Sequence, residues 1–339
     1  MELTDRKQKI LVAIIEKYIE SGEPVGSKTL SEAFGNTVSP ATIRNDMADL
    51  ASLGFLIQPH ASAGRIPSPK GYRYYVDRLM SKKDLGDTER KAIEATLLSH
   101  GGEPEQLLED ASALLAQMTN CVAIATTLSD ENETVSKIEL MPLGKSTLLL
   151  VVISSSGLIK NRVCRLSTDV SDTLVEQFRS VVSEHFIGVP VNEIGTVTIQ
   201  TVAASLGSAG MDMYPLLIAL SEMLREISER GVLLEGESNI LGFESAENAK
   251  SLMQFLSSTE GIKNIISEEK GGLSVVIGSE NPHKELRDSS LIIARYKIDG
   301  NDAGALGIIG STRIDYAKLI PHIEYLTDLV GRLLSDVIE

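Results

Sequence analysis

The chain has 339 residues, of which 42% are apolar, and this is enough to form the cores of two or three domains. Its formal net charge of −15 argues against a protein that binds nucleic acid over its whole surface. The charge is unevenly distributed, however, because residues 1–90 contain 13 Lys and Arg against 12 Asp and Glu, whereas residues 91–339 contain 19 against 35. This is the pattern of an acidic body with a more basic head.

Cysteine, histidine and hydropathy patterns exclude several classes of protein. Cys121 and Cys164 stand far apart in apolar runs, which fits buried cysteines of a reducing compartment better than a disulfide. The five histidines are scattered, so we expect neither a metal site nor a cofactor. The longest purely apolar run, residues 148–153, is far shorter than the roughly 20 residues that span a bilayer, and no secretion signal follows Met1. We therefore expect a soluble, cytoplasmic protein.

The residues at the start of the chain predict a helix-turn-helix. Thr4 is expected to cap a first helix with an apolar stripe over residues 10–19. Ser27 is expected to cap a short helix over residues 28–34, and a turn with glycine leads to a longer helix. A short helix, a tight turn and a longer helix in this order are typical of DNA-binding proteins.

The longer helix covers residues 39–50 and has one apolar and one polar face. Ser39 can cap the free amides at its start, and Pro40 suits the first helical position. At about 100° per residue, the apolar face contains Ile43, Met47 and Leu50. The outer face carries Ala41, Thr42, Arg44 and Asn45.

The outer face of this helix suits the major groove of DNA. Asn45 can form two hydrogen bonds with adenine, and Arg44 can contact guanine or a phosphate. Ala41 and the methyl group of Thr42 can pack against thymine. The alternative is an ordinary capped helix whose polar face is only solvated, since caps and amphipathic faces are common.

Residues 56–67 predict a two-stranded β-ribbon, or wing, after the helix-turn-helix. Two prolines bound its loop, and Gly64 suits the tip of a ribbon. An arginine at a wing tip can reach a phosphate or the minor groove, so Arg65 and His60 are candidate DNA contacts. The alternative for Arg65 is a solvated loop side chain.

The following segment, residues 68–79, mixes basic and aromatic side chains. Residues 62–83 contain six Lys and Arg and a single acid, Asp77, and such a local charge can hold the phosphate backbone. The side chains expected to contact the DNA backbone here and in the helix-turn-helix are Ser27, Lys28, Ser39, Lys70 and Arg73. We expect the tyrosines to pack onto neighbouring helices rather than to stack on bases.

Beyond residue 80 the pattern predicts an α+β body. Helical patterning runs from residue 88 to residue 118, with an interruption at residues 101–102. Short apolar or alternating segments predict strands at residues 121–128, 138–143, 147–154, 158–165, 273–277, 290–298 and 303–309. Amphipathic helices at residues 171–186 and at the C-terminus would flank one antiparallel sheet. The long segment 188–271 would then be an inserted subdomain.

No catalytic pattern stands out in the body. Residues 144–147 resemble part of a phosphate loop, but Glu139 stands where that motif needs glycine, and a strand follows in place of a helix, so a hairpin turn is predicted. Gly304, Gly307 and Gly310 suit strand packing better than a dinucleotide-binding fingerprint. Without a nucleophile and base in a recognisable arrangement, we expect that the protein is not an enzyme.

An ordered set of motifs resembles the HrcA family of heat-inducible transcription repressors. The motifs are residues 39–46 (SPATIRND), 54–56 (GFL), 62–67 (SAGRIP), 69–75 (PKGYRYY), 234–241 (LEGESNIL), 277–281 (IGSEN) and 307–316 (GIIGSTRIDY). The resemblance implies a bacterial repressor with a winged-helix head, a GAF-like domain and an inserted dimerisation domain. It also implies an inverted-repeat operator upstream of chaperone operons, and dependence on a GroE-type chaperonin for the active fold.

The resemblance and the patterns together predict an α+β multidomain protein. We expect a winged helix-turn-helix domain at residues 1–80, a linker and helix at 81–103, a GAF-like antiparallel-sheet domain at 104–187 and 272–339, and an inserted α/β dimerisation subdomain at 188–271. The leading hypothesis is a homodimeric repressor whose two heads bind an inverted repeat of double-stranded DNA. The alternative is a ligand-sensing regulator with a small-molecule pocket in the GAF-like domain, which the fold alone does not establish.

Overall fold

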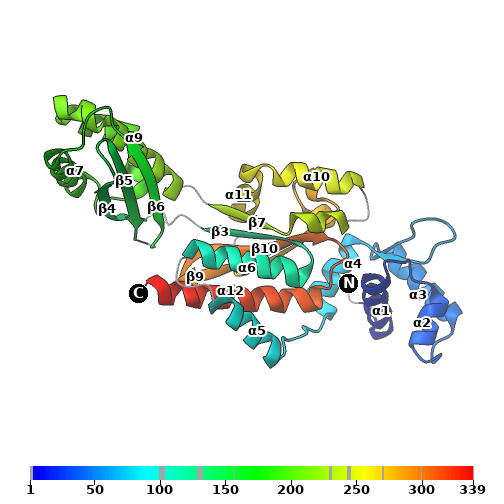
Figure 1. Ribbon diagram of the computed structural model, residues 1–339. Coiled ribbons are helices and arrows are strands. Elements are labelled where there is room, and N and C mark those ends of the chain that lie inside the picture. Colours follow the sequence, from blue (N-terminus) through cyan, green and yellow to red (C-terminus); the bar gives the residue numbers. More distant parts are fainter. Residues whose placement is uncertain are drawn as a thin grey trace.

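The computed structural model describes residues 3–98, 104–127, 133–155, 157–228, 231–242, 246–268, 271–298 and 300–338. Figure 1 shows three bodies in a row: a small head at one end, a five-stranded sheet with helices in the middle, and a three-stranded sheet with helices at the other end. None of the helices in these ranges is long and apolar enough to cross a membrane. The chain is therefore an α+β protein, as predicted.

The head is a winged helix-turn-helix, as predicted. Each of its helices buries an apolar stripe, and Ile14, Leu30, Ile43 and Leu50 are buried in a common core. Its elements are α1 (Asp5–Ser21), α2 (Ser27–Ala33), α3 (Pro40–Ser52), β1 (Leu56–Ile57), β2 (Ile66–Pro67), α4 (Pro69–Tyr74) and the π-helical turn η1 (Tyr75–Leu79).

The helix starts in the head differ from the prediction in two of three cases. Ser39 accepts a hydrogen bond from the Thr42 amide at 3.2 Å and so caps α3, as predicted. Ser27 does not cap α2, because it is the first helical residue and Gly26 occupies the cap position. Thr4 precedes α1 but its side chain makes no capping hydrogen bond. Glycine is also tolerated as a cap, so the presence of a nearby serine does not decide where a helix starts.

The middle body is built on a five-stranded antiparallel sheet with strand order β7-β3-β10-β9-β8. The strands are β3 (Val122–Thr127), β7 (Val232–Glu235), β8 (Leu273–Ile277), β9 (Ser289–Ile298) and β10 (Asn301–Ser311). Both faces of the sheet are covered. Because successive residues of a strand point to opposite sides, each strand contributes side chains to a core on each face. In β3, for example, Ala123 and Ala125 belong to one hydrophobic core and Val122 and Ile124 to another.

Helices on the two faces of this sheet supply the rest of these two cores (Figure 1). On one face lie α6 (Pro104–Thr119) and α12 (Tyr316–Ile338), with α5 (Asp87–Leu98) packed outside them. On the other face lie α10 (Ala246–Leu256) and α11 (Thr259–Glu268). Three short 3₁₀ turns connect these elements: η3 (Glu237–Gly242), η4 (Gly278–Glu280) and η5 (Lys284–Leu286).

The third body is a three-stranded antiparallel sheet, β4-β5-β6, with its own hydrophobic core. The strands are β4 (Val135–Pro142), β5 (Thr147–Ser154) and β6 (Ile159–Arg165). The remaining elements are α7 (Asp172–His185), η2 (Val191–Glu193), α8 (Thr196–Ser205) and α9 (Ser208–Ser228). Residues 144–147 form the predicted hairpin turn, since they join two paired strands.

The prediction that all the strands beyond residue 80 share one sheet is wrong. The strands of residues 135–165 pair only with one another, and residues 232–235 join the five-stranded sheet instead. The excursion from the larger sheet is therefore residues 133–228, between β3 and β7, whereas the predicted insertion of residues 188–271 combines parts of both bodies. Alternation in the sequence reports which face of a strand is buried, and it does not report which strand lies beside it.

The glycines of β10 are packing residues, as predicted. A Cβ atom on Gly307 would lie 2.6 Å from the carbonyl oxygen of Ile292, and one on Gly310 would lie 2.7 Å from Sγ of Cys121. Both distances are shorter than real Cβ contacts, so the neighbouring groups fill the space that a side chain would need. No dinucleotide-binding turn is formed, because these glycines lie inside a strand.

Candidate nucleic-acid interface

Helix α3 presents an exposed polar face at the end of the molecule farthest from the three-stranded sheet (Figure 1). Ile43 and Leu50 are fully buried on its inner side, whereas Ala41, Arg44 and Asn45 are exposed. Within the part of the chain that the structure describes, neither the Arg44 side chain nor the Asn45 side chain has a hydrogen-bond partner. These side chains are thus available to an external ligand, which is what the helical period predicts.

The first turn of α3 is held by side chains as well as by backbone hydrogen bonds. Besides the cap, the hydroxyl groups of Ser39 and Thr42 are 2.9 Å apart and share a hydrogen bond. Because the Thr42 hydroxyl is engaged in this way, its methyl group is the part left for an apolar contact. This is the role expected for a threonine beside the 5-methyl group of thymine.

Ion pairs fix α3 on α1. Arg6 donates to both carboxylate oxygens of Asp46, with Nε–Oδ2 at 2.7 Å and Nη2–Oδ1 at 3.1 Å. Asp46 follows Asn45 directly and its side chain is only 5% exposed, so this fork holds the helix beside its exposed face. Lys7 makes a second bridge, to Asp49 at 2.7 Å. Sequence reasoning overlooked Asp46; the available signal was a charged residue next to the apolar stripe of α3.

The wing is a short ribbon whose loop carries His60 but not Arg65. His60 is exposed in the loop, which Gln58 closes by donating from Nε2 to the carbonyls of Ala61 at 2.9 Å and Ala63 at 3.2 Å. Arg65 lies at the base of the wing, where its backbone N–H and carbonyl pair with those of Val25, both at 2.9 Å. The prediction that Arg65 is at the wing tip is therefore wrong.

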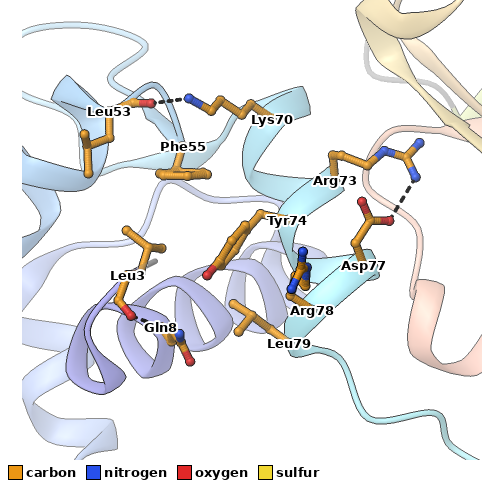
Figure 2. A pocket seen from close by; sticks show the side chains of 10 residues that line it. All are labelled: Leu3, Gln8, Leu53, Phe55, Lys70, Arg73, Tyr74, Asp77, Arg78 and Leu79. Carbon is orange, nitrogen blue, oxygen red and sulfur yellow. Dashed lines mark hydrogen bonds and ion pairs between the residues drawn. The ribbon is translucent and has the colours of Figure 1, made fainter. Parts of the chain in front are cut away.

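Lys70 is exposed and holds the exit of α3. Its Nζ donates to the carbonyl of Leu53 at 2.8 Å and lies 4.7 Å from the centre of the Phe55 ring. Figure 2 shows this contact at the rim of a groove of about 640 Å³ between α1, α4 and η1, with Tyr74 beside Phe55. Capping of a carbonyl and contact with an aromatic ring both stabilise the turn after α3.

Arg73 is directed away from this groove, toward the five-stranded sheet (Figure 2). Its Nε donates to Oε1 of Glu280 at 2.9 Å and its Nη2 to Oε2 at 2.5 Å, while Nη1 contacts Asp77 at 3.3 Å. Hydrogen bonding to Glu280 raises the pKa of Arg73 despite its partial burial. The structure thus engages the Arg73 guanidinium within the protein, where the sequence predicts a contact with the DNA backbone. The tyrosines next to it pack as predicted, with Tyr72 and Tyr75 buried.

The remaining predicted contacts lie in α2. Lys28 is exposed and Ser27 half-buried in its first turn, and no described residue pairs with the Lys28 ammonium group. The predicted set thus divides into exposed residues in α2, α3, α4 and the wing loop, and residues that hold the head together or hold it to the sheet. The exposed residues are Lys28, Ser39, Ala41, Arg44, Asn45, His60 and Lys70, the last of which also holds the exit of α3.

Two further features of the described residues concern metal and small-molecule binding. No group of three or more His, Cys, Asp or Glu in the described ranges is placed to hold a metal ion. An open groove of about 700 Å³ runs beside α12 and the ends of β8 and β9. Charged side chains of both signs line it, among them Lys297, Arg332 and Asp328.

Comparison with known proteins matches this chain to one family over almost its whole length. Residues 2–77 match a family model described as "Winged helix-turn-helix transcription repressor, HrcA DNA-binding", and residues 105–320 match "HrcA protein C terminal domain". The heat-inducible transcription repressor HrcA of Alkaliphilus metalliredigens is 36% identical over 339 residues, which cover 99% of each chain. That of Clostridium acetobutylicum is 35% identical over 338 residues, covering 99% of this chain and 98% of the relative.

A solved structure shares the fold. The crystal structure of a hypothetical protein superposes with a TM-score of 0.74 and 24% sequence identity, over 99% of this chain and all of that one. The DNA-binding head and the C-terminal body are thus matched both by family models and by full-length relatives. The chain belongs to the HrcA family of heat-inducible transcription repressors, whose members bind DNA through a winged helix-turn-helix and are not enzymes.

Proposed function

We propose that this protein is a homodimeric repressor that binds an inverted-repeat operator upstream of heat-shock chaperone operons, with α3 of each head in the major groove. The observation that carries the proposal is the face of α3 on which Ala41, Arg44 and Asn45 are exposed while Asp46, one residue further, is fixed to Arg6 at 2.7 Å. A rigid, exposed Asn and Arg on a capped helix is what direct readout of bases requires.

The residues of the head have different proposed roles. Asn45, Ala41 and Thr42 contact base edges, and Arg44 contacts a base or a phosphate. Contacts to phosphates position the head without reading sequence. We assign these to Ser27, Lys28 and Ser39 near the starts of α2 and α3. His60 in the wing loop reaches the backbone or the minor groove. Arg65 supports the wing from its base.

Replacement of Asn45 tests the proposal. We expect Asn45→Ala to lose about 1–3 kcal/mol of discrimination at one base pair of each half-site while non-specific binding to DNA changes little. The operator is first selected from random DNA. Footprinting and binding titrations on that operator and on scrambled DNA then measure the specific and the non-specific affinity separately. Gln117→Ala, which removes an exposed amide from α6 in the sheet body, is the matched control and should bind as the wild type does. Unchanged protection of the operator by Asn45→Ala would refute the assignment.

We infer that the body of residues 133–228 forms the dimer and that the five-stranded sheet body is GAF-like. An inverted repeat needs two heads related by two-fold symmetry. Most of the exposed large apolar side chains of the described residues lie on the three-stranded body, including Val163 at 61% exposure and Met211 at 82%. Met141, Leu149 and Val163 pair directly across the three strands, so they form a contiguous apolar face of the kind that marks an interaction site. Because the proposed operator is chromosomal DNA of a bacterium, we also propose that the protein acts in the cytoplasm.

We further propose that a GroE-type chaperonin supplies the DNA-binding fold. Support comes from membership of a family named for heat-inducible repression and from the apolar side chains that a monomer leaves exposed. If the native population is marginal, the supply of chaperonin sets the active fraction. Refolding with and without chaperonin, followed by operator titration, measures that fraction, and an inert protein at equal mass is the control. Equal active fractions would contradict this part of the proposal.

A further inference from the structure

Three of the motifs that carry the family resemblance meet where the head contacts the five-stranded sheet body. They are residues 69–75 of the head and residues 277–281 and 307–316 of the sheet body. None of them belongs to the exposed face of α3, and their residues form the contact between the two bodies. Pro69 of the head lies against Gly278, where a Cβ would be 3.2 Å from its Cγ.

Arg73 makes the principal polar contact across this boundary. Its guanidinium forms a two-bond fork with Glu280 and also donates through Nη2 to the carbonyl of Val275, on the edge strand β8. The Glu280 carboxylate accepts a further hydrogen bond from the amide of Ile277 at 2.8 Å. Burial favours a raised pKa for Glu280, but the hydrogen bonds from Arg73 and Ile277 outweigh it, so that the pKa is lowered. The contact is thus a charged, oriented pair.

Arg313 makes a second contact, at the end of the first helix of the head. Its Nη1 donates at 3.2 Å to the carbonyl of Ile19, in the last turn of α1, where carbonyls lack helical partners and a positive charge is favoured. A Cβ on Gly22 would be 3.1 Å from the same guanidinium nitrogen. Between these polar contacts the buried rings of Tyr72 and Tyr316 lie 5.6 Å apart.

We propose that Arg73 and Arg313 are positioning residues: by holding the head on the sheet body, they set the separation of the two recognition helices in the dimer and therefore the half-site spacing of the operator. The inference rests on the proposed function, since spacing has meaning only for a dimer on an inverted repeat. It goes beyond that function because neither residue touches DNA in the proposal.

The geometry supports positioning in a DNA-competent orientation. The polar face of α3 is exposed while the head is docked on the sheet body, so docking leaves it available to DNA. Two heads held rigidly at the right separation bind a matched repeat with a high effective concentration and a mismatched repeat poorly. Heads on a flexible tether lose that distinction, since they reach repeats of many spacings. Spacing preference is therefore the property that this contact controls.

The test compares operators that differ only in the spacing of their half-sites. For the wild type we expect one preferred spacing. For Arg73→Glu and for Glu280→Arg we expect the affinity ratio between that spacing and one changed by half a helical turn, about 5 base pairs, to fall roughly tenfold. Preference for the half-site sequence should not change. The double variant with both charges exchanged should recover most of the ratio, which a general loss of stability would not allow.

Arg78→Glu is the matched control, because Arg78 is exposed in η1 and no described residue pairs with it. It should keep the wild-type spacing ratio. Arg313→Ala should lower the ratio as Arg73→Glu does. An unchanged ratio in a folded Arg73→Glu variant would overturn the inference.

A measurement without DNA separates failure of this inference from failure of the proposed function. Spin labels on Glu32→Cys in α2 and Met253→Cys in α10, both exposed positions, report the distance between the head and the sheet body. Labelled protein is diluted with unlabelled protein so that only distances within one chain count. We expect one narrow distance in the wild-type background and a broad distribution with Arg73→Glu. If the wild type selects no inverted repeat, the proposed function fails, but the distances still test this inference. Identical distance distributions in the wild-type and Arg73→Glu backgrounds would overturn it.

Discussion

Cys121 is buried in the core of the five-stranded sheet body. Its side chain is 4% exposed, packs against Gly310 and donates from Sγ to the carbonyl of Thr119 at 3.4 Å. Burial raises the pKa of the Cys121 thiol to about 11, and the side chain of Thr119 only partly opposes this. The thiolate is the reactive species. A pKa of about 11 in place of the ordinary 9 lowers the thiolate population about 100-fold below pH 9. This agrees with the sequence interpretation of Cys121 as a buried packing residue.

We therefore predict that Cys121 resists alkylation in the folded protein and reacts after unfolding. The folded state holds its proton more tightly than the unfolded state, so the contribution to stability is complete below pH 9 and is lost as pH rises toward 11. Urea titrations between pH 9 and pH 11 should show the wild type losing about 2 kcal/mol more stability than Cys121→Ala, as the pKa shift implies. Parallel curves for the two proteins, or rapid alkylation of the folded wild type at pH 8, would contradict this.

Single side chains were predicted best where their partners are local. Ser39 caps α3 and Asn45 is exposed because both follow from a few neighbouring residues. The intramolecular contacts of Lys70 and Arg73 were not predicted, because their partners, Leu53 and Glu280, lie 17 and 207 positions away. A basic residue in a basic segment is equally consistent with a phosphate and with a distant carboxylate. Only the fold decides between them.

Elements were predicted more reliably than their assembly. Strands β5 and β8 coincide with the predicted segments at residues 147–154 and 273–277. The period of apolar residues that predicts a strand depends only on residues that are close together in the chain. Sheet membership depends on pairing across long separations, as when β3 pairs with β10 and β7. The division into two sheets was therefore missed, and with it the bounds of the insertion.

At the scale of the whole molecule, charge and shape work together. Residues 91–339 carry 16 more acidic than basic side chains, which opposes the approach of DNA to the two sheet bodies. The row of three bodies in Figure 1 places α2, α3 and the wing at the end farthest from the three-stranded sheet. A dimer joined through that sheet body would keep its contact surface away from DNA. The inferred dimer surface is thus compatible with two exposed heads.

Charged substitutions on the three-stranded body test that dimer. Met211 is 82% exposed on α9 and Val163 is 61% exposed on β6, so Lys at either position should be tolerated by the folded monomer. In an apolar interface the same Lys would lose its hydration, and we expect Met211→Lys or Val163→Lys to raise the dimer dissociation constant tenfold or more, about 1.4 kcal/mol. Sedimentation over a range of concentrations measures it.

The control for these variants is Met253→Lys, at a methionine 51% exposed on α10 of the five-stranded sheet body, which should leave the dimer intact. Binding to DNA provides the second readout. A variant that dissociates the dimer should keep its preference for one half-site but lose the gain in affinity from the second, because the two binding events are no longer linked. If both variants remain dimeric with full affinity for the inverted repeat, the dimer forms elsewhere on the chain.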